Sequence, residues 1–298
     1  MTATNEPLPR LTVIVPAYNE SARILDCIAT LKAQSYPSNL LQIIIVDNGS
    51  KDDTFDILRR TPGILALQET QPGSYAARNL ALRHATGDIV GFTDADCSAD
   101  PNWVRNAVAH LKNPNIGIVA GHVALDFGHG GRPSSSELFE QCFAFKQAEN
   151  AALGVCVTAN WFSPRMLIEN MGGFDSSVRS GGDHKLSKQI SKAGYKIAYA
   201  PDVIVRHPAR TSFDELTRKR RRVIGGTYTT QCRGNKKPFP IFVAFLFKET
   251  LMRMHAIATR LPLRPLDRLR VGGLLIVLCG ISVAEAFRLQ LGGEPRRQ

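Results

Sequence analysis

The chain has 298 residues, of which 44% are hydrophobic and 21% are charged, and this composition excludes a mainly disordered chain. Its length is enough to bury a core as one large domain or as a domain with an appendage. The formal net charge of +11 is concentrated in the C-terminal third, because residues 1–200 carry 18 Lys and Arg against 19 Asp and Glu, whereas residues 201–298 carry 19 against 7. A basic segment that also contains apolar stretches indicates an anionic membrane surface as a partner and no nucleic acid.

The six cysteines are scattered along the chain and show no Cys-x-x-Cys or zinc-like spacing. The first residues, Met1–Arg10, are polar and show no secretory signal. We therefore expect reduced thiols and a cytoplasmic location.

Short apolar runs alternate with segments of helical spacing in the first hundred residues. Leu11–Val15, Leu41–Val46 and Ile89–Phe92 are uncharged runs that predict buried strands. Apolar residues at helical spacing in 24–31 and 54–58 predict helices between these strands. The alternation predicts an α/β fold with a mixed, mainly parallel sheet flanked by helices.

A polar cluster follows each predicted strand: Pro16–Glu20, Asp47–Ser50 and Asp94–Asp96. Because parallel sheets bind ligands outside the carboxyl ends of their strands, we expect the clusters to share one ligand-binding edge. Asp94 and Asp96 leave an extended backbone on the same face, where two carboxylates suit a divalent cation that also binds phosphate. A solvated turn is the alternative interpretation of this pair.

The segment Tyr75–Leu82 predicts a helix of small residues with Arg78 in its first turns. A helix N-terminus with an arginine can receive a phosphate group. The alternative is a packing helix whose arginine pairs with a carboxylate such as Asp94, and the two roles are compatible.

Four ordered motifs, Val13–Glu20, Ile45–Thr54, Ala77–Asn79 and Asp94–Asp96, resemble those of family 2 glycosyltransferases. The resemblance covers roughly residues 10–210 and implies a nucleotide-sugar-dependent enzyme of the GT-A fold. It also implies that Pro16, Tyr18 and Glu20 hold the nucleoside, with Tyr18 stacked on the base, and that Asp47 hydrogen-bonds the base. A packed aromatic at the strand end is the alternative for Tyr18.

By the same resemblance, Asp94 faces the ribose and Asp96 holds a divalent cation, Mn²⁺ or Mg²⁺, on the diphosphate. His207 ends another apolar run, Val203–His207. Some GT-A enzymes place a further metal ligand there, and imidazole can bind Mn²⁺. A structural histidine is the alternative.

Several elements are predicted between residues 116 and 162. Residues 116–127 predict a strand pair, Gly128–Ser136 a loop over the site, and Glu137–Ala152 a helix. Val155–Asn160 predicts a strand that ends near the acceptor. Trp161 departs from the small or aliphatic residue usual in the family, so Trp161 and its neighbour form either an acceptor wall or part of the core.

Asp183 corresponds to the catalytic base of the family, where the motif usually reads Glu-Asp. Here Gly182 stands in place of the Glu, and the base role is therefore assigned to Asp183 alone. A general base must lie within about 2.6–3.2 Å of the acceptor hydroxyl, directly or through one water. A helix N-cap is the alternative role for Asp183.

Arg218 and Arg222 lie four residues apart on a predicted helix, so they share one face. Processive relatives carry an Arg-rich motif here that ends in tryptophan, and Val223 replaces that tryptophan. The arginines are expected at the leaving diphosphate and acceptor, or on lipid headgroups.

Two apolar stretches follow, Pro238–Phe247 and Val271–Ala284. The second has 14 uncharged residues, fewer than the roughly 20 that span a bilayer, so interfacial attachment is expected. A re-entrant insertion and a helical lid are the alternatives. The expected domains are a GT-A catalytic domain over residues 1–210 and a membrane-associating helical region over 211–298.

Together these features predict an inverting glycosyltransferase on the inner face of the cell membrane. The expected donor is a nucleoside-diphosphate sugar, a UDP-sugar, and the expected acceptor is a glycan or lipid-linked hydroxyl in polysaccharide or glycolipid synthesis. A non-catalytic sugar-nucleotide-binding membrane scaffold is one alternative. A sugar nucleotidyltransferase is another, although Val13–Glu20 lacks the Gly-rich phosphate loop expected there.

Overall fold

The computed structural model of the chain describes residues 7–127, 132–233 and 238–296. The chain packs into two compact units. The first comprises residues 1–124, 146–176 and 182–207, and the second comprises residues 125–145, 177–181 and 208–298. The domain boundary expected between residues 210 and 211 lies close to the end of the first unit and stays a prediction.

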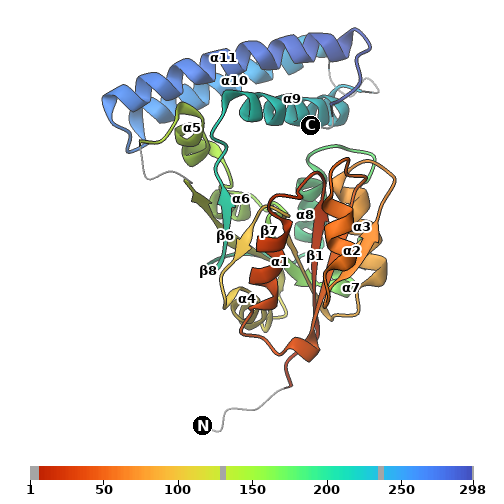
Figure 1. The fold of residues 1–298 in the computed structure, drawn as a ribbon. Coiled ribbons are helices and arrows are strands. Elements are labelled where there is room, and N and C mark those ends of the chain that lie inside the picture. The colour runs from red at the N-terminus through yellow and green to blue at the C-terminus, as the bar shows by residue number, and fades with distance from the viewer. Residues whose placement is uncertain (1–6, 128–131, 234–237, 297–298) are drawn as a thin grey trace. The chain divides into compact units, whose positions relative to one another are not determined.

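A mixed sheet forms the centre of the first unit (Figure 1). Over the described residues its strand order is β3-β2-β1-β4-β7-β6-β8-β5. The strands that pair in parallel are β1 (Leu11–Ala17), β2 (Leu41–Asp47), β3 (Leu65–Gln68) and β4 (Ile89–Thr93). The other strands are β5 (Ser98–Ala99), β6 (Ile116–Asp126), β7 (Asn160–Pro164) and β8 (Lys196–Pro208). Since β7 pairs antiparallel with β4 and β6, and β5 with β8, the predicted mixed sheet is confirmed.

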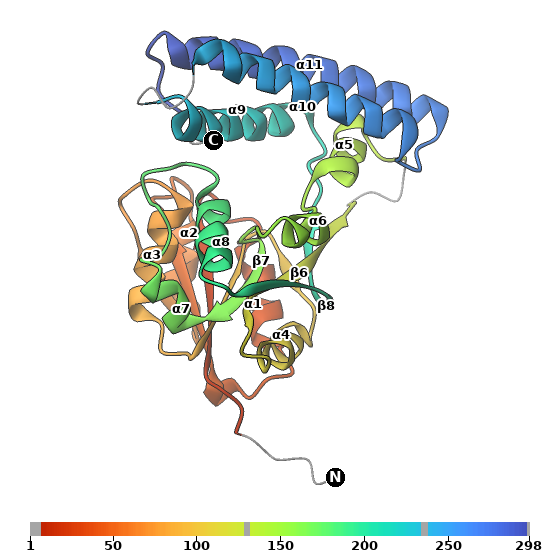
Figure 2. The ribbon, with the colours of Figure 1, turned by 180° about the vertical axis from the view of Figure 1, so that it is seen from behind.

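Helices flank this sheet, as the two opposite views show (Figures 1 and 2). They are α1 (Ile24–Lys32), α2 (Thr54–Arg60), α3 (Ser74–His84), α4 (Trp103–Leu111), α6 (Gln147–Ala152), α7 (Arg165–Asn170) and α8 (Gly182–Lys192), with a short 3-10 helix at Ser38–Leu40. Helix α3 packs against β1 and β2. It therefore lies beside the strands whose carboxyl ends were predicted to hold the ligand.

The register of the parallel strands brings their carboxyl ends to one edge. Ala17 pairs with Asp47 across β1 and β2, and Ile14 pairs with Phe92 across β1 and β4. The first two clusters include Ala17 and Asp47, and the third begins at Asp94, two residues after Phe92. The three clusters therefore lie at one edge of the sheet, and the binding of a ligand there stays a prediction.

The antiparallel half of the sheet differs from the sequence prediction in two places. Residues Ile116–Asp126 form one long strand, not a strand pair. The strand predicted over Val155–Asn160 begins at Asn160 instead, because Trp161 pairs across the sheet with Phe92 of β4. The aromatic residues after Asn160 are thus strand residues.

The second unit contains α5 (Ser135–Phe143), α9 (Phe213–Gln231), α10 (Phe239–Thr259) and α11 (Pro265–Gln290). Helices α9, α10 and α11 lie side by side in both views (Figures 1 and 2). The helix predicted over Glu137–Ala152 is wrong as one element, because α5 ends at Phe143 and Phe145 adopts a positive φ of 47°. Residues 128–131 of the predicted loop lie outside the described residues.

Among the described residues, α11 is the one helix whose length and hydropathy are enough to cross a membrane, with a mean hydropathy of 1.8 over its most apolar window. A basic and an acidic residue pair at each of its ends, Arg270 with Asp267 and Arg288 with Glu285. The apolar helix that the sequence predicted near the C-terminus is therefore present.

Candidate active site

Backbone hydrogen bonds tie together the loops that follow β1 and β2. The Asn19 N–H donates to Ser50 Oγ, and the Lys51 N–H donates to Asn19 Oδ1, each over 2.8 Å. The Glu20 N–H donates to Thr54 Oγ1 over 2.8 Å. Since Asn19 has a φ of 55°, which asparagine tolerates better than most residues, this loop is bent so that its neighbours Tyr18 and Glu20 lie half-buried at the sheet edge.

The predicted base-binding residues occupy this edge in different ways. Pro16 lies within β1 and is partly buried. Asp47 is fully buried, and its carboxylate accepts hydrogen bonds from the N–H groups of Gly49 and Ser50. Asp47 therefore shapes the loop after β2, and its contact with a base, like that of Tyr18, stays a prediction.

Arg78 is almost completely buried at 3% side-chain exposure and forms an ion pair with Asp94, whose side chain is 35% exposed. Its Nη2 lies 2.8 Å from Asp94 Oδ1. Its Nε–H is buried without a hydrogen-bond partner among the described residues. The ion pair with Asp94, which the sequence offered as the alternative role of Arg78, is therefore present. A phosphate oxygen would satisfy the unpartnered Nε–H.

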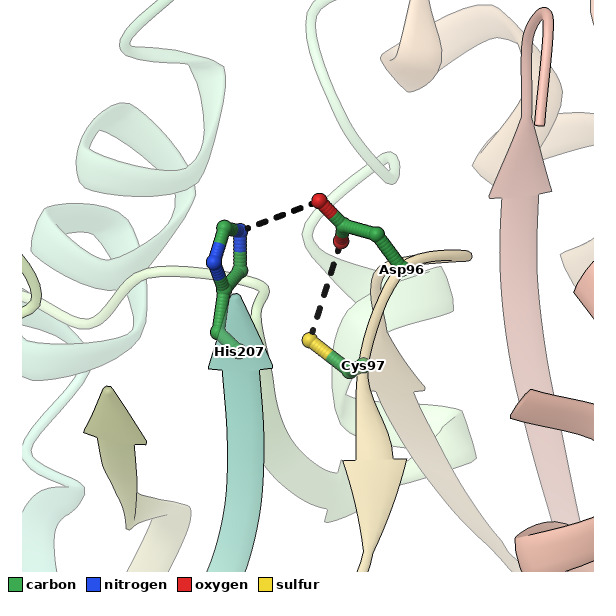
Figure 3. A group of neighbouring side chains, drawn as sticks. All are labelled: Asp96, Cys97 and His207. Carbon is green, nitrogen blue, oxygen red and sulfur yellow. Dashed lines mark hydrogen bonds and ion pairs between the residues drawn. The ribbon is translucent and has the colours of Figure 1, made fainter. Parts of the chain in front are cut away.

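Asp96, Cys97 and His207 lie together at the end of β8 (Figure 3). Ser98 lies opposite Arg206 in the antiparallel pairing of β5 with β8. Cys97, which precedes Ser98, therefore meets His207, which follows Arg206, and both lie beside Asp96. His207 Nε2 lies 3.4 Å from Asp96 Oδ2, and Cys97 Sγ lies 3.9 Å from Asp96 Oδ1. The sequence predicted Asp96 and His207 as metal ligands and missed Cys97.

The donor atoms of Asp96 and His207 suit a divalent cation. Two ligands at about 2.1 Å from an octahedral ion lie about 3 Å apart, which is close to their observed separation of 3.4 Å. Burial raises the pKa of the Cys97 thiol well above its ordinary value, and the charge of Asp96 adds to this effect. A protonated, soft sulfur ligand does not suit Mg²⁺ or Mn²⁺, so Asp96 and His207 are the residues that fit this cation.

Negative charge accumulates where these loops meet. Burial, and after it the nearby charges of Asp96 and Asp94, raise the pKa of Glu20 from 4.5 to about 7, while Arg23 opposes the shift. The three carboxylates thus interact, as expected for residues that share one edge. A divalent cation or another positive group would relieve their repulsion.

Asp183 lies at the start of α8, and two donors orient its carboxylate. The Tyr75 hydroxyl donates to Oδ1 over 3.0 Å, and the His184 N–H donates to the same atom over 2.9 Å. Burial raises the pKa of the Tyr75 phenol far above its ordinary value, with a further contribution from the charge of Asp183. Tyr75 therefore stays protonated and acts as the donor.

The structure explains why glycine precedes Asp183. A Cβ atom on Gly182 would lie 2.8 Å from the Tyr75 ring, so any side chain there would displace this ring. Sequence reasoning missed Tyr75, which stood inside the predicted helix with no signal beyond its aromatic type. Its partner lies 108 residues away in the chain.

One turn of α3 joins the two parts of the site. Tyr75 and Arg78 are three residues apart, and the guanidinium carbon of Arg78 lies 5.8 Å from the centre of the Tyr75 ring. Tyr75 bonds Asp183, and Arg78 bonds Asp94. The expected base and the acidic edge are thus held by neighbouring side chains of one helix.

The remaining predicted site residues lie in other surroundings. Asn160 is fully buried, accepts from the Trp103 indole N–H and donates to the carbonyls of His122 and Val203. Trp161 is also fully buried and packs edge-on against Phe92. Both residues are part of the sheet core, and their contact with an acceptor stays a prediction.

Arg218 and Arg222 lie on α9 in the second unit, with Arg218 exposed and Arg222 partly buried. Their contact with the leaving diphosphate or with lipid stays a prediction.

The raised pKa of Glu20 predicts a pH-dependent stability. The folded-state pKa of about 7 exceeds the ordinary value of 4.5. Ionisation of Glu20 therefore lowers the free energy of unfolding progressively as the pH rises from about 4.5 to about 7, and the full loss is reached above about pH 7. We expect Glu20→Gln to raise the Tm of the metal-free protein more at about pH 8 than at about pH 5. The matched control is Glu149→Gln, at an exposed position of α6. An equal change in Tm at both pH values for Glu20→Gln would contradict the interpretation.

Comparisons with known proteins agree with this geometry. The sequence model of glycosyl transferase family 2 matches residues 12–172. The chain is similar to glycosyltransferase AglE of Haloferax volcanii, with 34% identity over 229 residues that cover 75% of this chain and 73% of that protein. It is 25% identical over 287 residues to a beta-monoglucosyldiacylglycerol synthase of Synechocystis sp., covering 86% of this chain and 57% of that enzyme.

Among solved structures, the chain resembles the mannosyltransferase PcManGT of Pyrobaculum calidifontis in complex with GDP-Man and Mn²⁺. The TM-score is 0.63 with 25% identity, and the match covers 95% of this chain and 87% of that one. The family model covers more than half of the chain, and the archaeal relative exceeds 30% identity over three quarters of it. The chain therefore belongs to glycosyl transferase family 2 and has the GT-A fold.

Proposed function

We propose that this family 2 glycosyltransferase is metal-dependent and inverting, with a nucleoside-diphosphate sugar as donor and a hydroxyl of a glycan or lipid-linked molecule as acceptor. The proposal rests on one observation: α3 holds Asp183 through Tyr75 and Asp94 through Arg78. A proton acceptor is thereby fixed near a charged edge that suits a cation and a diphosphate. The similar PcManGT, which was solved with GDP-Man and Mn²⁺, supports this interpretation.

On the donor side, the proposed roles follow the positions of the side chains. Tyr18 stacks on the base, and an aromatic face suits any base. Arg78 directs its unpartnered Nε–H to a phosphate oxygen. Asp96 and His207 hold a divalent cation, Mn²⁺ or Mg²⁺, which when bound offsets the charge that grows on the leaving diphosphate.

Asp183 is the proposed general base. Its carboxylate accepts the proton of the acceptor hydroxyl while the acceptor oxygen bonds to the anomeric carbon and the bond from that carbon to the diphosphate breaks. Attack from the face opposite the leaving group inverts the anomeric configuration. Tyr75 is a positioning residue, because its hydroxyl fixes the orientation of the Asp183 carboxylate.

The second unit supports attachment to the inner face of the cell membrane. Helices α10 and α11 expose many large apolar side chains, the most exposed of which are Leu251, Met252, Leu266, Leu269 and Ile276. Although α11 as a whole is long enough to cross a bilayer, its uncharged part, Val271–Ala284, is only about 21 Å long, shorter than the roughly 30 Å of a bilayer core. We therefore place the helices in the plane of the interface. The six cysteines are all buried thiols, which suits a reducing cytoplasmic side.

Nucleoside diphosphate release separates this proposal from its alternatives. With a panel of UDP- and GDP-sugars and Mn²⁺, we expect release that chelation of the metal abolishes. Asp183→Asn should lower kcat by about 100-fold or more, while calorimetry shows donor affinity unchanged. Tyr75→Phe should lower kcat by about tenfold with the donor KM retained.

The matched control for these variants is Asp26→Asn, at an exposed position of α1. Full activity of Asp183→Asn would remove this residue from the mechanism. Donor binding without release for every sugar would favour the membrane scaffold instead.

Vesicle flotation of the full chain measures membrane attachment. Each exposed leucine that enters the interface contributes about 1.5 kcal/mol, so the double variant Leu251→Gln and Leu269→Gln should weaken binding to anionic vesicles by about 100-fold. The control Leu153→Gln and Met166→Gln alters equally apolar exposed positions in the first unit. Equal flotation of both double variants would show that α10 and α11 do not form the membrane-binding surface.

A further inference from the structure

The second unit contains an open cavity of about 120 Å³ that is lined by residues of α5, α9, α10 and α11. Its apolar walls are formed by Phe139, Phe143, Leu216, Val223 and Leu278. Pockets that bury a drug-sized ligand measure about 300–1,000 Å³, so this cavity can receive only part of a lipid, such as a head group and the first carbons of a chain.

Cationic side chains line the same cavity: Lys219, Arg220 and Arg253. Two carboxylates pair with this group. Lys219 bonds Glu140 over 2.7 Å, while Arg220 and Arg253 approach Glu249 to 2.9 Å and 2.6 Å. These pairs fix the cations in place, since each carboxylate has two cationic partners.

The pairing leaves positive charge in excess. Glu140, which is 1% exposed, also pairs with Arg210, so this group holds four cations, Arg210, Lys219, Arg220 and Arg253, against two carboxylates, a net of +2. Burial, and after it the charge of Arg210, lowers the pKa of Lys219 to about 8, against the attraction of Glu140. The four cationic side chains are only partly exposed, and a partly buried group with uncompensated positive charge is stabilised by an anion.

Aromatic rings, one of them the wall residue Phe143, face two of these cations. Lys219 Nζ lies 5.1 Å from the centre of the Phe145 ring, and the guanidinium carbon of Arg253 lies 5.1 Å from the centre of the Phe143 ring. These cation–π contacts hold the charged groups against apolar surface. The cavity therefore offers both a positive head-group site and an apolar lining.

We propose that this cavity binds the phosphate head of a lipid, with the first carbons of its chain against the apolar wall. Inorganic phosphate would leave the aromatic and aliphatic walls without contacts, and a neutral lipid would leave the excess cations without an anion. The same helices α10 and α11 expose the apolar side chains described above, which suits a ligand whose chain extends into a lipid phase. The ligand is either a membrane phospholipid or a lipid phosphate that serves as acceptor, and the second source rests on the proposed function.

Calorimetry on the full chain, with probes below their micellar concentrations, tests the proposal. The probes are farnesyl phosphate, dihexanoyl phosphatidic acid, farnesol and inorganic phosphate. We expect at least one lipid phosphate to bind with one-to-one stoichiometry and at least about tenfold more tightly than farnesol or phosphate alone. Equal affinity for inorganic phosphate, or no binding of either lipid phosphate, would overturn the proposal.

Variants locate the binding in the cavity. Arg253→Gln should weaken lipid phosphate binding by about tenfold or more, whereas Arg260→Gln, at the exposed end of the same helix, should leave it unchanged. Thermal melts report whether each variant is folded. Val223→Phe, which fills the cavity without changing its charge, gives the same test should Arg253→Gln fail to fold. Wild-type affinity in the folded variants would place the lipid elsewhere and contradict the proposal.

The release of nucleoside diphosphate from the donor distinguishes an acceptor lipid phosphate from a membrane phospholipid. Faster release of nucleoside diphosphate on addition of farnesyl phosphate, and not of phosphatidic acid, identifies an acceptor. Binding of both without any change in release identifies a membrane phospholipid head group. Because binding is measured separately from release, failure of the proposed transferase function would leave the binding result intact.

Discussion

Arg78 lies almost wholly inside the first unit, where an arginine is stable only beside a carboxylate. Asp94 supplies that carboxylate from the end of β4, over 2.8 Å. Loss of Asp94 would leave the buried guanidinium of Arg78 without a countercharge, so the pair fixes α3 against the carboxyl edge of the sheet. Tyr75, one turn away on α3, then holds Asp183. One ion pair thus determines where both the acidic edge and the proposed base are placed.

The negative charge at this edge of the sheet would favour the binding of a cation. Burial, together with repulsion from Asp96 and Asp94, raises the pKa of Glu20 to about 7. The ion pair with Arg78 offsets only part of that charge. A cation between Asp96 and His207 would reduce the repulsion and present a positive centre to a diphosphate. The same repulsion that lowers the stability of the metal-free protein would therefore favour the metal-bound nucleotide that we propose as ligand.

Local patterns predicted the parallel strands and their polar ends, because alternating apolar runs and turn residues reflect contacts close in sequence. Contacts across the sheet were not predictable in this way. Cys97 reaches His207 only through the register of β5 on β8, and Tyr75 reaches Asp183 across 108 residues. The burial of Asn160 was likewise not predictable, because its amide bonds three distant groups that no spacing rule identifies.

The central claim is that Asp96 and His207 hold the cation of a metal-bound nucleoside diphosphate at the edge that α3 connects to Asp183. A crystal structure of the full chain with Mn²⁺ and a nucleoside diphosphate, with anomalous diffraction data that locate the manganese, tests this claim most directly. The account predicts one anomalous peak within about 2.2 Å of both Asp96 Oδ2 and His207 Nε2, with the diphosphate bound to it. A peak away from Asp96, or a diphosphate bound outside this edge, would contradict it.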